Sequence, residues 1–171
     1  FDEIENNPSV ETVEKATIVA IEKKIEFVIG IGGGSPIDAA KAIAVLAANP
    51  DMKALDLFKN EFKTVLPIIG IPTTAGTGSE TTLAAVITDA ETRHKYAIND
   101  FPLIPRYAVL DPKVTLSLPP FITATTGMDA LTHAVEAYIG NSTTPGTRKN
   151  ALDAVRLIFE NLDTAYTDGQ N

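Results

Sequence analysis

Residues 27–48 read FVIGIGGGSPIDAAKAIAVLAA, and this stretch decides the fold. Residues 27–31 form a short, continuous apolar run, which is typical of a strand buried on both faces. Three glycines and Ser35 follow the run, and residues 36–48 are predicted to form a helix that ends at Asn49-Pro50. A strand, a glycine turn and a helix in this order predict one βα unit of a parallel sheet.

Further elements on either side support the same architecture. Residues 9–24 are predicted to form a helix capped by Ser9, because apolar positions recur at three- and four-residue spacing: Val10, Val13, Thr17, Ile18 and Ile21. After the central stretch we expect a loop with one turn of helix at 52–64, a second buried strand at 66–71, a hairpin of 83–88 with 94–98, and a short strand at 107–110.

The character of the chain changes after Pro112. Two helical segments follow, at about 121–139 and 147–165, and Pro119-Pro120 precedes the first of them. We therefore expect an α/β domain at residues 1–115 and a helical domain from residue 116 to residue 171.

Composition excludes several classes of function. The 171 residues carry a net charge of −8, which argues against a nucleic-acid or anionic-membrane surface, since both need a basic patch. No cysteine is present, so a metal would have to bind histidine, aspartate or glutamate. No apolar run approaches the roughly 20 residues of a membrane span. We expect a cytoplasmic protein.

The glycine triplet after the first strand lies where a phosphate could approach the main chain. Gly33 and Gly34 allow a tight turn, Ser35 is predicted to cap the helix, and Pro36 would occupy its first position. Asp38 follows Ser35 by three residues, as in a capping box. The N–H groups at such a helix end form an anion site. A plain strand-to-helix turn is the alternative, because the pattern is not the six-residue GxGxxG fingerprint.

A second loop, PTTAGTGS at 72–79, follows the second predicted strand. Thr73, Thr74 and Thr77 supply hydroxyl groups that suit phosphate and ribose oxygens. Both loops would emerge at the carboxyl ends of parallel strands, where ligands bind in open sheets. Lys95, in the predicted hairpin, could meet a phosphate or a ribose. The alternatives are a flexible loop and a solvated lysine.

The stretch GMDALTHAVEAY at 127–138 carries a carboxylate and an imidazole. Asp129 and His133 are four residues apart and share one helical face. A helix so poor in charge is expected to be buried on most sides, where such groups must be paired or bound to a metal. Spacing alone favours an Asp–His hydrogen bond without metal. Two ligands are too few for a catalytic metal, and His94, expected at the surface, belongs to another segment; for Glu136 we expect a supporting role.

Together these stretches resemble the iron-containing (group III, metal-dependent) alcohol dehydrogenases. The matching text is GGGSPIDAAKAIA at 32–44, IPTTAGTGSE at 71–80, LDP at 110–112, and LP with GMDALTHAVEAY at 118–138; Thr81 replaces the valine usual after the glutamate. The resemblance implies an α/β fold like dehydroquinate synthase, with a parallel-sheet dinucleotide-binding domain followed by the start of an all-helical metal-binding domain.

The resemblance also implies residue roles. Asp129 and His133 would be two metal ligands for Fe²⁺ or Zn²⁺, which reverses the preference drawn from spacing. The residues expected at the dinucleotide, NAD or NADP, are Gly34, Ser35, Thr73, Thr74, Thr77, Val86 and Lys95, to which we add Gly33 and Asp38 of the first loop. The implied reaction is reversible hydride transfer between an alcohol and the nicotinamide, with the metal holding the alcohol oxygen. The implied partners are a small alcohol or aldehyde and, in the full-length protein, further copies of the same chain.

Two alternatives stay open at this point. One is a lyase of the same fold, such as a dehydroquinate synthase, although its metal-binding helix differs from GMDALTHAVEAY. The other is a non-catalytic nucleotide-binding fragment. The resemblance implies that the chain is an internal fragment, with the family's first strand before Phe1 and two further histidine ligands after Asn171. We accordingly expect these 171 residues alone to bind metal weakly and to turn over no alcohol.

Overall fold

The computed structural model describes residues 1–59, 62 and 64–170, which tertiary contacts divide into two compact units. The α/β unit comprises Phe1–Pro72 and Ser79–Leu110, and the helical unit comprises Thr73–Gly78 and Asp111–Asn171. The second glycine loop therefore packs with the helical unit, although it follows a strand of the α/β unit.

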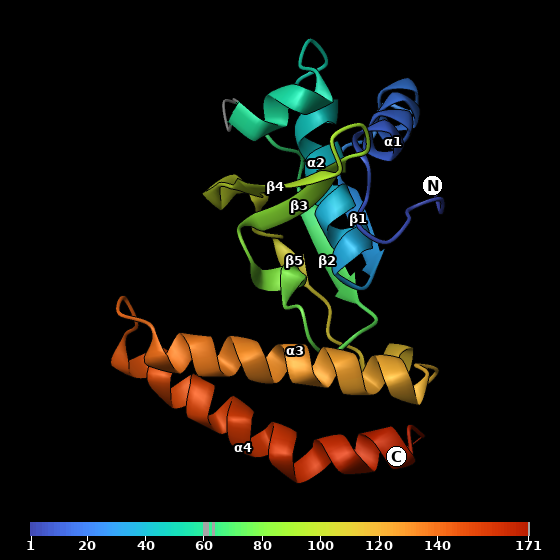
Figure 1. Cartoon of the computed structure of the whole chain (residues 1–171). Coiled ribbons are helices and arrows are strands. Elements are labelled where there is room, and N and C mark those ends of the chain that lie inside the picture. The colour runs from blue at the N-terminus through green and yellow to red at the C-terminus, as the bar shows by residue number, and fades with distance from the viewer. Residues whose placement is uncertain (60–61, 63, 171) are drawn as a thin grey trace. The chain divides into compact units, whose positions relative to one another are not determined.

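A parallel sheet forms the centre of the α/β unit, as the sequence predicted. Its strands in the described part of the chain are, in spatial order, β1 (Val28–Gly32), β2 (Ile68–Pro72) and β5 (Tyr107–Ala108). Helix α2 (Gly34–Ala48) packs on β1 and β2, and Figure 1 shows it lying against these strands. Gly30 makes this close packing possible, because a Cβ there would lie 2.9 Å from the Cβ of Ala40.

Strand β1 is not buried on both faces, which corrects the sequence prediction. The Ile29 and Ile31 side chains remain 47% and 59% exposed, whereas Gly30 between them is buried. Strand β1 lies at the edge of this sheet, and α2 covers the face on which Gly30 lies. A continuous apolar run thus identified the strand correctly, but burial of its second face requires an additional element packed against it.

Helix α1 (Val10–Glu22) begins as predicted after Ser9, whose Oγ accepts a hydrogen bond from the Thr12 N–H at 3.2 Å. Its buried stripe differs in part from the prediction, since Ile18 and Ile21 are exposed. The residues that face the core are Val10, Val13, Ala16, Thr17 and Ala20. Helix α1 packs on α2, and its larger apolar residues Ile18, Val19 and Ile21 remain outside the buried stripe.

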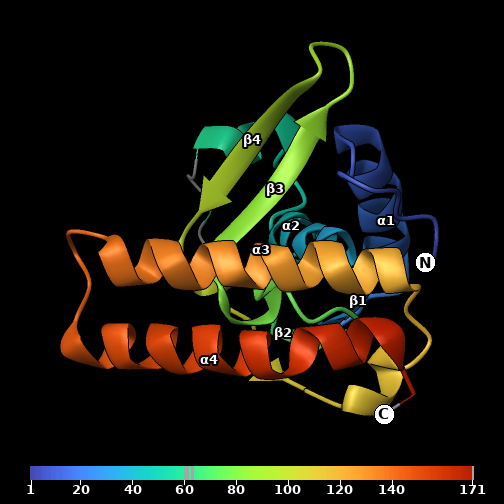
Figure 2. The ribbon, with the colours of Figure 1, turned by 60° about the horizontal axis from the view of Figure 1, so that its bottom comes forward.

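The predicted hairpin is confirmed as β3 (Ala84–Asp89) and β4 (His94–Asn99), which pair antiparallel (Figure 2). Asp89 closes the turn, because its Oδ1 accepts from the N–H groups of Glu91 and Thr92 at 2.9 and 3.3 Å. Strand β3 also packs against α2. The hairpin is thereby fixed to the same helix that follows the first glycine loop.

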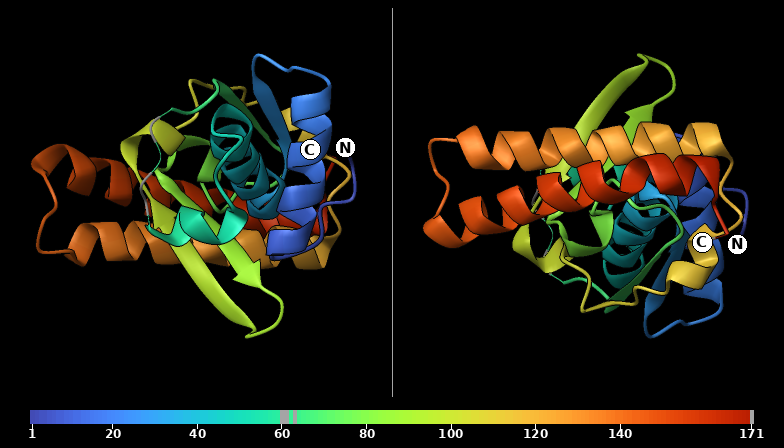
Figure 3. Two further views of the ribbon diagram at one scale, coloured as in Figure 1. Left: turned by 90° about the horizontal axis from the view of Figure 1, so that it is seen from above. Right: turned by 90° about the horizontal axis from the view of Figure 1, so that it is seen from below.

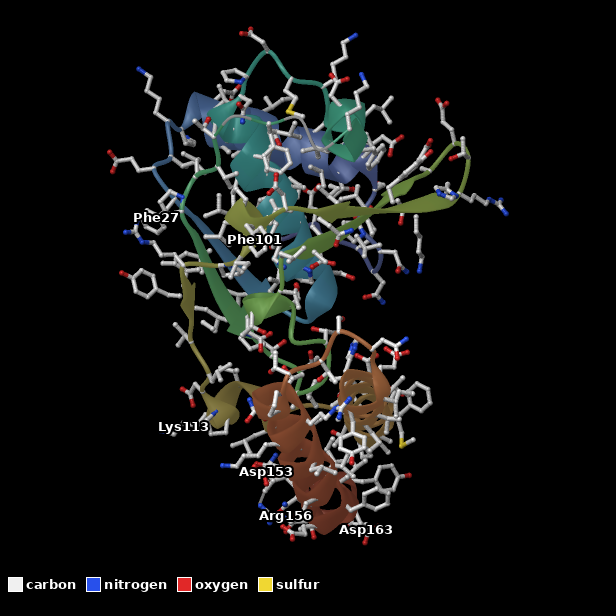
Figure 4. The ribbon with its side chains drawn as sticks, turned by 90° about the vertical axis from the view of Figure 1, so that its left-hand side faces the viewer. Phe27, Phe101, Lys113, Asp153, Arg156 and Asp163 are labelled. Carbon is white, nitrogen blue, oxygen red and sulfur yellow. The ribbon has the colours of Figure 1, made fainter. Side chains whose placement is uncertain are left out.

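Short 3₁₀ helices complete the α/β unit: η1 (Ala54–Lys59), η2 (Ser79–Thr81) and η3 (Phe101–Leu103). Helix η1 is the predicted turn within 52–64, and positions 60, 61 and 63 of that range lie outside the described residues. Phe58 of η1 stacks on Tyr96 of β4 with ring centroids 3.9 Å apart. Phe27 and Phe101, labelled in Figure 4, are by contrast largely exposed.

The helical unit contains η4 (Pro112–Thr115), α3 (Pro120–Ile139) and α4 (Pro145–Thr167). Helices α3 and α4 run antiparallel and side by side (Figures 2 and 3). Gly127 allows their close approach, because a Cβ there would overlap the side chain of Leu162. Thr144 caps α4 by accepting from the Thr147 N–H at 3.1 Å. Both helices were predicted within two residues of their bounds.

The expectation that the helix with Asp129 and His133 is buried on most sides is wrong. The buried residues of α3 are Gly127 and Ala134, and five of its larger apolar side chains are exposed: Phe121, Met128, Val135, Tyr138 and Ile139. Within the described helical unit α3 packs mainly against α4, so one side of each helix is covered. The other side of α4 carries charge, and its exposed Asp153, Arg156 and Asp163 are labelled in Figure 4. Among the described residues, no helix combines the length and the apolar character that a membrane crossing needs.

Candidate functional site

The turn between β1 and α2 is built on glycine, but its cap differs from the prediction. Gly32 has a φ of 145°, which favours glycine, and α2 begins at Gly34 with Gly33 as its N-cap. Ser35 and Pro36 lie inside the first turn, so the predictions of Ser35 as the cap and Pro36 as the first helical residue are wrong. No side chain caps this helix end, which leaves room for a phosphate at its main-chain N–H groups.

Ser35 bonds to the N-terminal segment instead. Its Oγ accepts from the Asn7 N–H at 3.1 Å, and the Asn7 Oδ1 accepts from the Lys95 Nζ at 2.7 Å. Asn7 thus joins two predicted cofactor residues, and the sequence analysis missed it. No local signal could have revealed it, because its partners lie 28 and 88 residues away. His94, next to Lys95, is exposed as predicted.

Asp38 does not form the predicted capping box. One carboxylate oxygen accepts from the Ser79 Oγ, and the other accepts from the Val86 N–H at 3.0 Å. The prediction failed because α2 begins one residue before Ser35, which places Asp38 in the second helical turn. Burial raises the pKa of Asp38, while its hydrogen bonds with Ser79 and Val86 and the nearby Lys41 oppose that rise.

Lys41 is a second residue that the sequence analysis missed. Its side chain is 0% exposed, and its Nζ lies 3.9 Å from the Asp38 carboxylate. Burial lowers the pKa of Lys41 to about 8, against the opposing charges of Asp38 and Glu80. The sequence did hold a signal, because a lysine inside the apolar run 39–46, three residues after an aspartate, must have a buried partner if the helix packs on a sheet.

The second glycine loop, Thr73–Gly78, packs on helix α3. A Cβ on Gly76 would lie 2.5 Å from the main-chain oxygen of Thr126, so glycine is required where the loop meets the helix. Thr73 and Thr77 are half-buried, and the Thr74 Oγ1 is buried with no hydrogen-bond partner. A buried hydroxyl without a partner lowers stability unless a ligand supplies the missing bond. Thr74 therefore fits an oxygen of a bound phosphate or ribose.

Asp129 and His133 lie together on α3, as their spacing predicted. The Asp129 Oδ2 and the His133 Nε2 are 3.6 Å apart, and the side chains are 45% and 57% exposed. This separation is longer than a hydrogen bond, so the geometry does not support the metal-free Asp–His hydrogen bond. Glu136, on the same helix, is exposed.

A carboxylate and an imidazole form a donor set that suits Fe²⁺ or Zn²⁺. Within the described chain, neither side chain forms a hydrogen bond or ion pair with a residue outside this pair. No group of three or more histidines, aspartates or glutamates gathers anywhere in the described residues. The chain therefore offers two donors that fit a divalent metal, and not a complete catalytic set.

Comparison with known proteins decides the family. The sequence profile of iron-containing alcohol dehydrogenases matches residues 1–112. The chain belongs to the iron-containing alcohol dehydrogenase family. The profile of the C-terminal part of the same family matches residues 123–171. This result confirms the resemblance drawn from the glycine loops and the helix at 127–138.

Relatives of this chain carry the names of alcohol dehydrogenases. Alcohol dehydrogenase 4 of Saccharomyces cerevisiae is 42% identical over 175 residues, covering 100% of this chain and 45% of the yeast protein. The NADPH-dependent butanol dehydrogenase of Clostridium saccharobutylicum is 41% identical over 168 residues, covering 95% of this chain and 43% of that protein. The chain thus spans less than half the length of either relative, and these names do not favour the lyase alternative.

Solved structures confirm the predicted fold class. The iron-containing alcohol dehydrogenase of Thermotoga maritima superposes with a TM-score of 0.92 at 43% identity, covering 98% of this chain and 46% of that chain. The sulfoacetaldehyde reductase of Bifidobacterium kashiwanohense, in complex with NAD⁺, superposes with a TM-score of 0.96 at 36% identity, covering 100% of this chain and 46% of that chain.

Proposed function

We propose that the protein containing this chain is a metal-dependent alcohol dehydrogenase that transfers hydride between a small alcohol and NAD or NADP. The observation that carries the proposal is the Asp129–His133 pair, which is half-exposed on α3 and not joined by a hydrogen bond. Family membership supports it, because relatives are named alcohol and butanol dehydrogenases and one neighbouring structure holds NAD⁺.

The residues of the α/β unit suit the dinucleotide. Gly33 and Gly34 present main-chain N–H groups at an uncapped helix end, where a pyrophosphate is stabilised by the helix dipole. Ser35 and Lys95 add a hydroxyl and a cation, both oriented by Asn7. Thr73, Thr74, Thr77 and Val86 complete the proposed set. Asp38 contributes through the main chain of Val86, since both of its oxygens already accept hydrogen bonds.

Asp129 and His133 would hold the divalent metal, Fe²⁺ or Zn²⁺. When bound, such a metal polarises the alcohol oxygen, and the nicotinamide accepts the hydride. Overall the alcohol loses a hydride to the cofactor and its hydroxyl proton to solvent, which gives an aldehyde or ketone. The two side chains of α3 need no rearrangement of a structural bond to bind a cation, because neither forms a hydrogen bond with the other at 3.6 Å.

The proposal has further parts at the level of the whole protein. Residues 1–115 would form the dinucleotide-binding domain, and residues 116–171 would belong to the helical metal- and substrate-binding domain. We also propose a cytoplasmic location and assembly into a homo-oligomer, both from the family resemblance.

The test uses the natural protein that contains these residues. Purified with Fe²⁺ or Zn²⁺, it should oxidise butanol with NAD⁺ or NADP⁺, followed by absorbance of the reduced cofactor. Asp129→Ala and His133→Ala should each lower the metal content and lower turnover by more than about a hundredfold, since a metal ligand is lost. NADH affinity should stay within about twofold of the wild type, because α3 supplies no proposed cofactor contact.

Matched variants control for the loss of a histidine or an aspartate elsewhere. His94→Ala on β4 and Asp153→Ala on α4 remove exposed side chains of the same types and should leave turnover unchanged. Absence of redox activity on every alcohol or aldehyde tried, by a metal-loaded and folded wild type, would refute the proposal. Full activity in His133→Ala would refute the assignment of this histidine to the metal.

A further inference from the structure

The ammonium group of Lys41 is buried and has several bonding partners. Its Nζ lies 2.6 Å from the Ala84 main-chain oxygen, 3.0 Å from the oxygen and 3.0 Å from the Oγ1 of Thr82, and 3.3 Å from the Ser79 Oγ. An ammonium group has three N–H donors, so these acceptors satisfy it completely. Asp38, at 3.9 Å, supplies the opposite charge.

A lysine in such a place needs an explanation, because burying a charge lowers stability unless it is paired and hydrogen-bonded. The neighbours Ala39, Ala40 and Ala42 are buried, so Lys41 lies in a stretch of α2 where the other buried residues are apolar. Conformational specificity is therefore the more informative explanation: the ammonium selects one arrangement of the segment that it bonds.

All the acceptors of Lys41 lie in one segment, residues 79–84, where the chain re-enters the α/β unit after the second glycine loop. Asp38 binds both ends of nearly the same segment, through the Ser79 Oγ and the Val86 N–H. One turn of α2 thus holds residues 79–86 by side-chain bonds. The same helix begins at the first glycine loop.

We propose that Lys41 is a positioning residue for dinucleotide binding, which fixes residues 79–86 relative to the N-terminus of α2. The inference rests on the proposed function, in which Gly33, Gly34 and Val86 contact the cofactor. The Lys41 side chain is 0% exposed, so it would not itself contact a bound cofactor. Lys41 instead fixes the geometry of the groups that would contact the cofactor. The affinity for the cofactor is therefore the quantity that it should control.

The test measures NADH affinity of the natural protein by the fluorescence of the bound nicotinamide. Lys41→Met keeps the length and apolar stem of the side chain and removes the donors. It should weaken NADH binding on the order of tenfold, as for other residues that orient a binding group through hydrogen bonds. The KM for the alcohol should change by less than about twofold, since α3 is not bonded to Lys41.

Two further variants make the test decisive. Thr82→Val removes one acceptor while keeping the shape of the side chain, and it should weaken NADH binding by a few-fold. Lys15→Met, on the exposed side of α1, is the matched lysine control and should bind NADH like the wild type. If Lys41→Met fails to fold, Thr82→Val decides alone.

The outcomes separate this inference from the proposed function. Folded Lys41→Met with wild-type NADH affinity, or Thr82→Val with wild-type affinity when the lysine variant does not fold, overturns the positioning role only. A folded wild type that binds no NADH overturns the proposed function and this inference together. Weaker NADH binding with an unchanged KM for the alcohol supports the role, because general damage to the fold would change both.

Discussion

Two helices of this chain carry an acid and a base about one turn apart, and the two pairs differ in burial and in bonding partners. On α2, Lys41 is 0% exposed and both Asp38 and Lys41 are bonded to main-chain and hydroxyl groups of residues 79–86. On α3, Asp129 and His133 are about half exposed and 3.6 Å apart. We call these the α2 pair and the α3 pair.

The difference separates a structural pair from a binding pair. The α2 pair is satisfied by the fold, and its loss would leave several buried groups without partners. The α3 pair contributes little to the fold, because exposed ion pairs are worth at most about 1 kcal/mol. Its oxygen and nitrogen atoms are therefore not needed to stabilise the fold, and they can bind a cation without loss of stability. Spacing in the sequence is nearly the same for both pairs, so burial and partners distinguish them.

The strongest test of the comparison removes the α2 ammonium. Lys41→Met should lower the free energy of unfolding by about 3 kcal/mol or more, because it leaves a buried carboxylate without its counter-charge. Urea denaturation of the natural protein, followed by circular dichroism, measures this change. Lys15→Met provides the control and should lie within about 0.5 kcal/mol of the wild type.

A loss below about 1 kcal/mol would contradict the comparison. It would mean that an apolar side chain at position 41 keeps nearly all of the stability that the ammonium provides, as happens when some buried ion pairs are replaced by apolar residues. The α2 pair would then resemble the α3 pair in its energetic weight, in spite of its burial.

The sequence predicted most of the helices and strands, but few of the hydrogen bonds that hold the candidate site residues in place. Strand, hairpin and helix positions followed from apolar runs and turn residues, which act locally. Ser35 was misassigned as a cap because α2 begins one residue before it, at Gly34, and the partner of its hydroxyl, Asn7, lies 28 residues away. The exposed face of β1 was misjudged because a strand's own residues do not say how many layers cover it.

In the candidate site too, local relations could be predicted from the sequence and contacts between distant residues could not. The Asp129–His133 juxtaposition could be predicted because a helix places residues four apart on one face. The role of Asp38 could not, since its partners Ser79 and Val86 lie 41 and 48 residues away and are brought near by the packing of η2 and β3 on α2. Lys41 could have been found from its apolar surroundings, but its acceptors could not, because they lie 38 to 43 residues away and half of them are main-chain oxygens.

The pH dependence of stability gives a smaller effect that sharpens the comparison. The pKa of Lys41 is lowered by burial from 10.5 to about 8, with Asp38 and Glu80 as the charges facing it. Between these values the unfolded chain binds a proton that the folded chain does not, so this residue adds stability as the pH rises through that window. The advantage of the wild type over Lys41→Met should grow by about 1.5 kcal/mol between pH 8 and pH 9.5.

Urea denaturation of both proteins at the two pH values measures this growth, and groups common to both cancel in the difference. A constant difference would show that Lys41 keeps its ordinary pKa and that its acceptors offset burial fully. His133→Ala, compared with the wild type at the same two pH values, should show no such growth.

The smallest effect is expected at the α3 pair. In metal-free protein, Asp129→Ala and His133→Ala should each change the free energy of unfolding by less than about 0.5 kcal/mol, because neither side chain is buried or tightly bonded. Addition of Fe²⁺ or Zn²⁺ at a hundred times its dissociation constant should stabilise the wild type by about 2.7 kcal/mol and the variants by much less. Thermal unfolding with and without metal measures both quantities on the same samples. A loss above about 1 kcal/mol without metal would place the α3 pair with the α2 pair as a structural element, whereas a neutral substitution that abolishes only the metal-dependent gain assigns these two side chains to binding.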